Sequence, residues 1–183
     1  MKEIEIKIID IDVEEIRRKL FNINAPKVKQ ENQINNIYDF PDKRLLNNKG
    51  YARIRTIHDE LTNSTVHYIT TKRLISQEKY KVMEEHESEI KDASAAKGIF
   101  EALGLELMQS IKKYRESYKY KDTLIEIDIN DKEFCPFPYI EIESAEEAQL
   151  EEVINLLGYS LSDTTSKTIY EILKSKNLKV KEL

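Results

Sequence analysis

The chain has 183 residues, of which 34% are charged, and a formal net charge of −5. This length suits one substantial domain, so we expect a single domain over residues 1–183. Because both signs are interspersed, the composition excludes the basic excess of a general nucleic-acid binder. A single cysteine, no signal peptide and no long apolar run predict a cytoplasmic protein outside the membrane.

The first stretch of the chain, residues 1–9, alternates charged and apolar side chains. Glu3, Glu5 and Lys7 alternate with three isoleucines, so an extended strand places the charges on one face and the isoleucines on the other. An ordinary half-exposed antiparallel strand has the same alternation, with its charges in water. The pattern gains weight only because it recurs in later strands.

The remaining elements are read from apolar periodicity, turn signals and helix caps. Asp12 and Glu15 predict a capping box at the first helix, and Ser144 and Glu147 predict another later in the chain. In chain order we expect a strand (1–9), a helix (12–23), four strands (33–40, 51–57, 65–73, 80–91), a helix (92–103), three strands (111–120, 123–130, 137–143) and two helices (144–157, 163–174).

Eight strands joined mostly by short turns favour antiparallel pairing and can close a barrel. If the charges faced water, the isoleucines would fill the interior, and the amphipathic helices would have little apolar surface to pack on. We therefore predict an α+β fold, a closed eight-stranded antiparallel β-barrel flanked by about four helices. Its isoleucines face outward beneath the helices, and its charges face the lumen.

Charged residues two positions apart recur along the predicted strands, and they carry both signs. The basic set is Lys7, Arg53, Arg55, Lys72, Lys113 and Arg115. The acidic set is Glu3, Glu5, Glu87, Glu89, Glu126, Asp128, Glu141 and Glu143. Buried charges are costly unless paired or coordinated, so we expect the two sets to pair. Arginine and lysine bind phosphate oxygens and clustered carboxylates bind magnesium or manganese, so a polyphosphate with its divalent ion suits this lumen.

The opening Glu-Ile-Glu-Ile-Lys, residues 3–7, resembles the ExExK signature of the CYTH superfamily, also called triphosphate tunnel metalloenzymes. This family includes class IV adenylyl cyclases and thiamine, inorganic and RNA triphosphatases. The resemblance runs essentially end to end, because later motifs follow in the family's order. These are Arg-Ile-Arg at 53–55, Thr-Lys at 71–72, Glu-Ser-Glu at 87–89, Lys-Tyr-Arg at 113–115, Glu-Ile-Asp at 126–128, Glu-Ile-Glu at 141–143, and Lys167.

The resemblance implies a role for each matching residue. The implied ligands of Mg²⁺ or Mn²⁺ are Glu3, Glu5, Glu141 and Glu143, with Glu126 and Asp128 as further ligands or their supporting neighbours. The implied triphosphate-binding residues are Lys7, Arg53, Arg55, Lys72, Lys113, Arg115 and Lys167. Glu87 and Glu89 match the acidic pair of the fifth strand. Glu85 stands where members often carry a basic residue, so we expect it to be a poor ligand.

For catalysis the resemblance implies an in-line attack that depends mainly on positioning and charge neutralisation. Our candidate base is Glu5, or a carboxylate of the last strand acting through water, and Lys7 is the candidate polariser or proton source. With water as the nucleophile the reaction releases phosphate. With the ribose 3′-hydroxyl of a bound ATP, it gives cyclic AMP and pyrophosphate.

Three functions remain open at this point. We favour a triphosphatase acting on inorganic triphosphate, thiamine triphosphate or a nucleoside triphosphate, because hydrolysis needs only the charged tunnel. An adenylyl cyclase would also need an adenine pocket, which has no separate signature here, although Tyr38 and Tyr170 could approach an organic group. A non-catalytic polyphosphate-binding module is disfavoured, because so many carboxylates weaken anion binding. Whether the chain forms a homodimer stays open.

Overall fold

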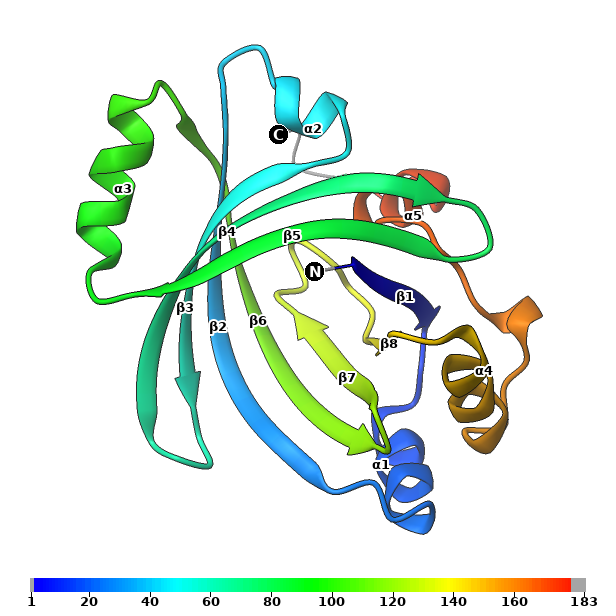
Figure 1. Cartoon of the computed structure of the whole chain (residues 1–183). Coiled ribbons are helices and arrows are strands. Elements are labelled where there is room, and N and C mark those ends of the chain that lie inside the picture. The colour runs from blue at the N-terminus through cyan, green and yellow to red at the C-terminus, as the bar shows by residue number, and fades with distance from the viewer. Residues whose placement is uncertain (1, 179–183) are drawn as a thin grey trace.

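The computed structural model describes residues 2–178, apart from the side chains of Lys2 and Glu3, and it is a closed antiparallel β-barrel (Figure 1). The strands follow the order β1-β5-β4-β3-β2-β6-β7-β8 around the barrel, and β8 pairs with β1 to close it. Every strand pair is antiparallel. The predicted α+β fold with an eight-stranded barrel is confirmed.

The elements have the following bounds. The strands are β1 (Lys2–Ile9), β2 (Lys27–Asp39), β3 (Tyr51–Asp59), β4 (Ser64–Gln77), β5 (Lys81–Ile90), β6 (Glu106–Tyr120), β7 (Thr123–Asn130) and β8 (Tyr139–Ser144). The helices are α1 (Val13–Asn22), α2 (Arg44–Asn47), α3 (Ala93–Ala102), α4 (Glu147–Leu156) and α5 (Ile169–Ser175), with a short 3-10 turn η1 (Leu161–Asp163). None of the helices described is long and apolar enough to cross a membrane.

Two strands extend well beyond their predicted starts at residues 33 and 111. β2 begins at Lys27 and β6 at Glu106, and the two pair with each other from Lys27–Tyr118 to Asp39–Glu106. The added residues lack a clean apolar alternation, and each added stretch pairs with the predicted part of the other strand, Lys27 opposite Tyr118 and Glu106 opposite Asp39. Only the pairing in the folded barrel supplies those partners.

The ends of two helices also differ from the prediction. The capping box at Ser144 and Glu147 is wrong, because Ser144 ends β8 opposite Ile4, and α4 follows Glu146 without a side-chain cap. The last helix begins at Ile169 instead of residue 163, since Thr165 is extended and bonds the backbone of Lys7. The one-turn helix α2 has no counterpart among the predicted elements.

The isoleucine faces form the core between the barrel and its covering helices, as predicted. The outward residues of β1, β7 and β8 pack with the inner faces of α1 and α4 in one cluster: Ile6, Ile8, Ile125, Ile127, Ile140, Ile142, Ile16, Leu20, Leu150, Val153 and Ile154. Each fully buried aliphatic side chain stabilises the fold by roughly 1.5–3 kcal/mol. Burial of the isoleucine faces beneath the helices therefore offsets the cost of placing charged side chains in the lumen.

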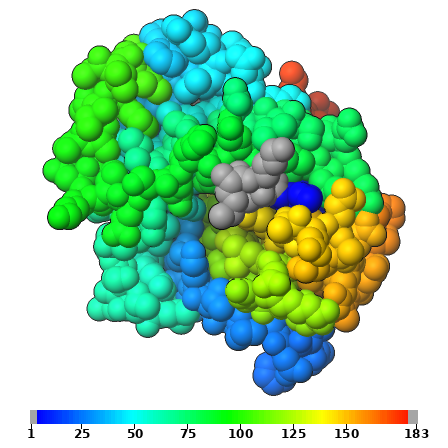
Figure 2. Space-filling view, viewed as in Figure 1, coloured from blue at the N-terminus to red at the C-terminus, as the bar shows by residue number. Residues whose placement is uncertain are grey.

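A second cluster holds α3 against the outside of β2 and β3. Phe100 meets Tyr38 edge to face with ring centroids 5.1 Å apart, over Ala52 and Ile54. Tyr38 is therefore part of this outer core, and the hypothesis that it approaches a substrate is wrong. In the space-filling view α3 stands out from the barrel wall beside the segment that carries α2 (Figure 2).

The helix α5 departs from the predicted arrangement, because it packs at an end of the barrel. Ile172 and Leu173 contact Tyr139 and are joined there by Ile9. These two strand residues share the faces of Lys7 and Glu141, which line the lumen. The apolar side of α5 thus packs on lumen-facing strand residues at this end instead of covering the outer wall.

The helix α1 is fastened to the outside of β6 by one buried carboxylate. Glu116 accepts hydrogen bonds from Arg17 at 3.0 and 2.8 Å and from the hydroxyls of Tyr114 and Tyr118 at 2.9 and 2.8 Å, and the ammonium of Lys27 lies 3.0 Å away. Burial alone would raise the pKa of Glu116, but these partners lower it to about 2 from its ordinary 4.5.

We predict that Glu116→Gln lowers the free energy of unfolding at neutral pH by about 2 kcal/mol, because it removes charge-assisted hydrogen bonds. The folded-state pKa is depressed, so this stabilisation is present above about pH 4.5 and is lost as the pH falls toward about 2. Urea unfolding of both proteins should show a difference that shrinks between about pH 5 and pH 3. Glu14→Gln is the matched control, since the Glu14 side chain that contacts Arg17 is 75% exposed. A constant difference across this pH range would contradict the assignment.

Candidate active site

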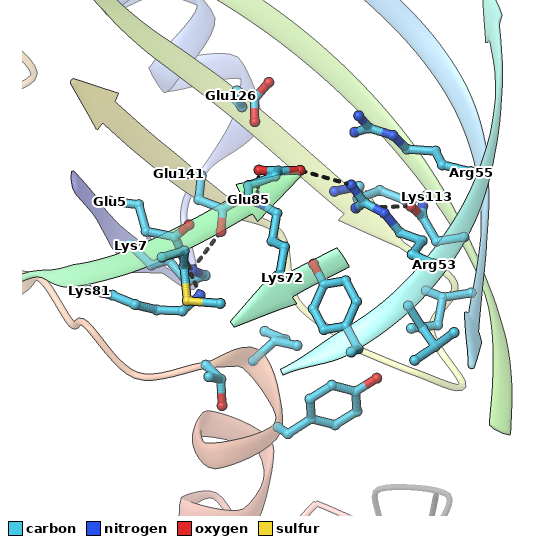
Figure 3. A pocket seen from close by; sticks show the side chains of 18 of the residues that line it. Glu5, Lys7, Arg53, Arg55, Lys72, Lys81, Glu85, Lys113, Glu126 and Glu141 are labelled. Carbon is cyan, nitrogen blue, oxygen red and sulfur yellow. Dashed lines mark hydrogen bonds and ion pairs between the residues drawn. The ribbon is translucent and has the colours of Figure 1, made fainter. Parts of the chain in front are cut away.

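The barrel encloses a cavity of about 960 Å³ whose lining comes from all eight strands and from α5. Charged side chains from opposite walls point into it, as Figure 3 shows. The predicted site residues that line it are Glu5, Lys7, Arg53, Arg55, Lys72, Glu87, Lys113, Arg115, Glu126, Glu141 and Glu143. The period-two alternation of the strands therefore turns the charged faces inward.

Three of the predicted site residues whose side chains the structure describes are not part of this lining. Asp128 is fully buried directly behind it, between Lys113 and Arg115. Glu89 and Lys167 are exposed and do not line the cavity, so the structure does not bring them to the other site residues. The side chain of Glu3 lies outside the described residues, and its metal-binding role stays a prediction.

Lys7 is the centre of the first group of lumen charges. Its ammonium lies 2.8 Å from an oxygen of Glu5 and 2.5 Å from an oxygen of Glu141, and the ammonium of Lys81 lies 2.5 Å from that same Glu5 oxygen. The strands fix this group, since Lys7 pairs with Glu141 across β1 and β8, and Glu5 pairs with Lys81 across β1 and β5. Figure 3 shows these four side chains converging on one wall.

The pKa values follow from this sharing of charge. Burial raises the pKa of Glu5, but the ammonium groups of Lys7, Lys81 and Lys72 together outweigh it and lower the value to about 2. The pKa of Glu141 is likewise far below its ordinary value, because Lys7 and Arg115 outweigh burial. Burial disfavours the ammonium of Lys7, but the two carboxylates raise its pKa above its ordinary value. All three groups are therefore ionised near neutral pH.

Arg115 is the centre of the second group. Its guanidinium binds Asp128 through two nitrogens at 2.6 and 2.7 Å, reaches an oxygen of Glu141 at 3.0 Å and pairs with Glu126. Lys113 lies 3.0 Å from Asp128. The fork geometry of arginine suits such multiple carboxylate contacts. Asp128 is therefore a supporting residue that orients the two cations.

The third group lies across the lumen on β3, β4 and β5. Both oxygens of Glu87 bind Arg55, at 2.9 and 2.8 Å, and one of them also lies 3.3 Å from Arg53. Lys72 lies 2.6 Å from Glu85. The Nε atoms of Arg53 and Arg55 are buried without a hydrogen-bond partner within the described part of the chain. Two arginines with a donor to spare suit an added anion.

Sequence reasoning missed Lys81 and dismissed Glu85. Both line the cavity, on the face of β5 that carries Glu87. The alternation of β5 was the available signal, because residues 81, 85 and 87 must share a face. Glu85 takes part in the charge network of the lumen, since it neutralises Lys72 and lies 3.6 Å from Arg53.

The carboxylates of this lumen have the donor chemistry of a magnesium or manganese site. The register brings them together on neighbouring strands, with Glu5 opposite Glu143 and Glu141 opposite Glu126. In the described part of the chain, however, no three acidic, histidine or cysteine side chains stand as a formed metal group. Lysine and arginine nitrogens lie between the oxygens instead. The residues fit a hard divalent cation in type and strand position. To bind it, the carboxylates would release some of their contacts to lysine and arginine and contact the cation instead.

Comparisons with known proteins agree with this architecture. The profile of the family described as CYTH domain matches residues 1–169. Among curated proteins, a search finds no match.

Solved structures with a similar fold include two proteins of Pyrococcus horikoshii OT3 and one of Hippeastrum. The PH1819 protein of Pyrococcus horikoshii OT3 is 23% identical with a TM-score of 0.78, covering 95% of this chain and 99% of that one. The PH1012 protein of the same organism is 25% identical with a TM-score of 0.75, covering 92% and 98%. HpAC1 of Hippeastrum, described as a candidate adenylyl cyclase with a dominant triphosphatase activity, is 16% identical with a TM-score of 0.69, covering 95% and 96%.

The Lys7 group generates a stability prediction. Lys7→Met should lower the free energy of unfolding by about 3 kcal/mol, because Glu5 and Glu141 lose a shared buried partner. Adding Glu141→Gln should recover part of this loss, which urea unfolding of the single and double variants can measure. Lys29→Met is the matched control, because the Lys29 side chain is 55% exposed at the cavity lining. Equal stability of Lys7→Met and wild type would contradict the pairing.

Proposed function

The chain belongs to the CYTH domain family, and from this premise we propose that it hydrolyses a triphosphate inside the barrel with a divalent cation, Mg²⁺ or Mn²⁺. The observation that supports this best is the charged lumen of the barrel, in which arginine and lysine side chains face a wall of carboxylates. The triphosphatase activity described for the Hippeastrum protein agrees with the proposal, although that likeness concerns the fold alone.

In this proposal the cationic walls hold the phosphate chain. Arg53 and Arg55 face the lumen with spare donors, and Lys72 stands beside them. Lys113 and Arg115 present positive charge from β6 on the other side. Phosphate oxygens would take over contacts that Glu85 and Glu87 now make to these cations, so the triphosphate binds by exchange of ion pairs.

The carboxylate wall would hold the cation. Glu5, Glu141 and Glu143 are the proposed ligands, with Glu126 beside them and Asp128 as a support behind. A bound divalent cation would neutralise charge on the phosphate oxygens and polarise the phosphorus that is attacked. The barrel itself contributes position and a surrounding of fixed charges, which is most of what phosphoryl transfer requires.

The surroundings of Glu5 and Lys7 support different roles in this proposal from a general base and a proton donor. Glu5 is a weak base, because two ammonium groups share one of its oxygens and its pKa is about 2. Lys7 is a weak proton donor, because its raised pKa favours the charged form. We therefore assign Lys7 the role of an electrostatic polariser, and Glu5 the role of a ligand and anchor for Lys7.

An assay of products tests the proposal directly. Purified protein with Mg²⁺ or Mn²⁺ should release phosphate from at least one of inorganic triphosphate, thiamine triphosphate and ATP. We predict that Glu141→Gln and Glu143→Gln each reduce turnover at least a hundredfold while preserving the fold, since each removes a charged oxygen from the proposed cation site. Cyclic AMP with pyrophosphate would instead identify a cyclase. Binding of a triphosphate without any product would identify a non-catalytic module.

The phosphate assignment makes a separate prediction. Arg55→Ala should raise the KM for the triphosphate roughly tenfold to a hundredfold, because it removes a charge-assisted contact, and initial rates measure this. Arg73→Ala is the matched control, because Arg73 follows Lys72 on the outward face of β4, pairs with Glu84 and is 72% exposed. An Arg55→Ala variant with ordinary substrate affinity would count against the assignment.

A further inference from the structure

Lys81 lines the cavity from the start of β5, and the proposed function gives it no role. It is only 9% exposed, and it stands opposite Glu5 in the pairing of β1 with β5. A buried ammonium is costly unless a partner compensates its charge, so a lysine at this position depends closely on its contacts. Figure 3 shows Lys81 beside Glu5 and Lys7, on the wall that carries the carboxylates.

The ammonium groups of Lys81 and Lys7 share a single oxygen of Glu5, at 2.5 and 2.8 Å. Their other contacts differ. Lys7 has a second carboxylate partner, since its ammonium lies 2.5 Å from an oxygen of Glu141. Among the side chains that the structure describes, Lys81 makes no ion pair other than the one with Glu5. Lys81 therefore depends on one carboxylate oxygen for charge compensation, whereas Lys7 does not.

Lys81 also lies close to cations of the third group. Burial raises the pKa of Tyr51, at the start of β3. Three cations, those of Arg53, Lys72 and Lys81, together outweigh burial and lower this pKa below its ordinary value. The ammonium of Lys81 thus adds to the positive potential that the proposed function uses for phosphate, while it also contacts a proposed cation ligand. Lys81 stands between the carboxylate wall and the cationic wall of the lumen.

A divalent cation on Glu5 would change the surroundings of Lys81. One carboxylate oxygen cannot keep two ammonium groups at hydrogen-bond distance while it binds a divalent cation, because the like charges repel each other. Lys7 has a second carboxylate to retain, but Lys81 would become a buried cation without an acidic partner. A phosphate oxygen is a strong partner for such an ammonium, because both groups are charged.

We propose that Lys81 is a further triphosphate-binding residue, and that it becomes available to phosphate when a divalent cation replaces it on Glu5. Through this lysine the cation and the triphosphate each favour binding of the other, and such coupling is reciprocal. Glu5 would then have two alternative partners, the ammonium of Lys81 and the divalent cation. The inference rests on the proposed function, since it concerns the same cation and the same substrate class.

Two calorimetric binding measurements on the full-length Lys81→Met variant test this. The first uses Mn²⁺ alone, and we expect about tenfold tighter binding than by wild type, because one competitor for the Glu5 oxygen is gone. The second uses imidotriphosphate, in which NH groups replace the bridging oxygens and prevent hydrolysis, at saturating Mn²⁺. Here we expect about tenfold weaker binding, because a charge-assisted contact to phosphate is lost.

Two further variants are the controls. Lys81→Arg keeps the positive charge, so both of its affinities should lie between those of Lys81→Met and wild type. Lys79→Met is the matched control, because Lys79 precedes β5, pairs with Glu151 and is 51% exposed outside the cavity lining, so neither affinity should change. Lys81→Met should fold, since Glu5 keeps Lys7, and circular dichroism checks this.

Opposite shifts of the two affinities distinguish this role from a structural one, because a distorted site would weaken both ligands together. Equal Mn²⁺ affinities, or an unchanged affinity for imidotriphosphate in folded Lys81→Met, would overturn the inference. Failure of wild type to bind either ligand would overturn it too. The proposed function fails separately, through absence of product from every triphosphate offered, and that result leaves the binding comparison intact. Product release together with a parallel loss of both affinities would keep the proposed function and reject the role of Lys81.

Discussion

Lys7 and Arg115 each hold more than one carboxylate inside the barrel, and this sharing of buried charge makes the fold possible. An isolated ion in such an interior would cost several kcal/mol or change its protonation. Here Lys7, Lys72 and Arg115 have acidic partners on the neighbouring strand, and Arg53 and Arg55 reach Glu87 across β4. The lowered pKa values of Glu5 and Glu141 have the same cause, because the neighbouring cations stabilise the ionised carboxylates.

The apolar layer outside the barrel follows from the charged interior. A strand with period-two alternation has one apolar face, and a barrel that turns charge inward must bury the isoleucines outside. The helices α1, α4 and α3 supply the cover, and the clusters around Ile140 and around Phe100 are the result. α5 does something different, since it packs on lumen-facing residues at one end of the barrel and brings Tyr170 to the cavity.

The same ion pairs that stabilise the lumen prepare it for the proposed reaction. Glu85 and Glu87 neutralise the cations that would bind phosphate, and Lys7 and Arg115 neutralise the carboxylates that would bind a divalent cation. A metal-bound triphosphate carries both complementary charges, so it can replace pairs on both walls at once. A ligand with one sign of charge alone would leave part of the lumen unpaired.

The alternation in β1, β3, β7 and β8 was enough to predict the barrel, the inward charges and the residues around Glu5, Arg53 and Glu141, because a strand assigns its faces by position alone. Strand pairing across the chain decided the rest. It lengthened β2 and β6 and paired Lys81 with Glu5. Lys167, in the segment before α5, and Glu89 lie outside the cavity lining. The aromatic side chains in the cavity lining also came together only in the tertiary structure, because Tyr51, Phe134 and Tyr170 are far apart in the chain. Local alternation is a property of neighbouring residues, whereas a cavity depends on which distant segments the barrel brings together.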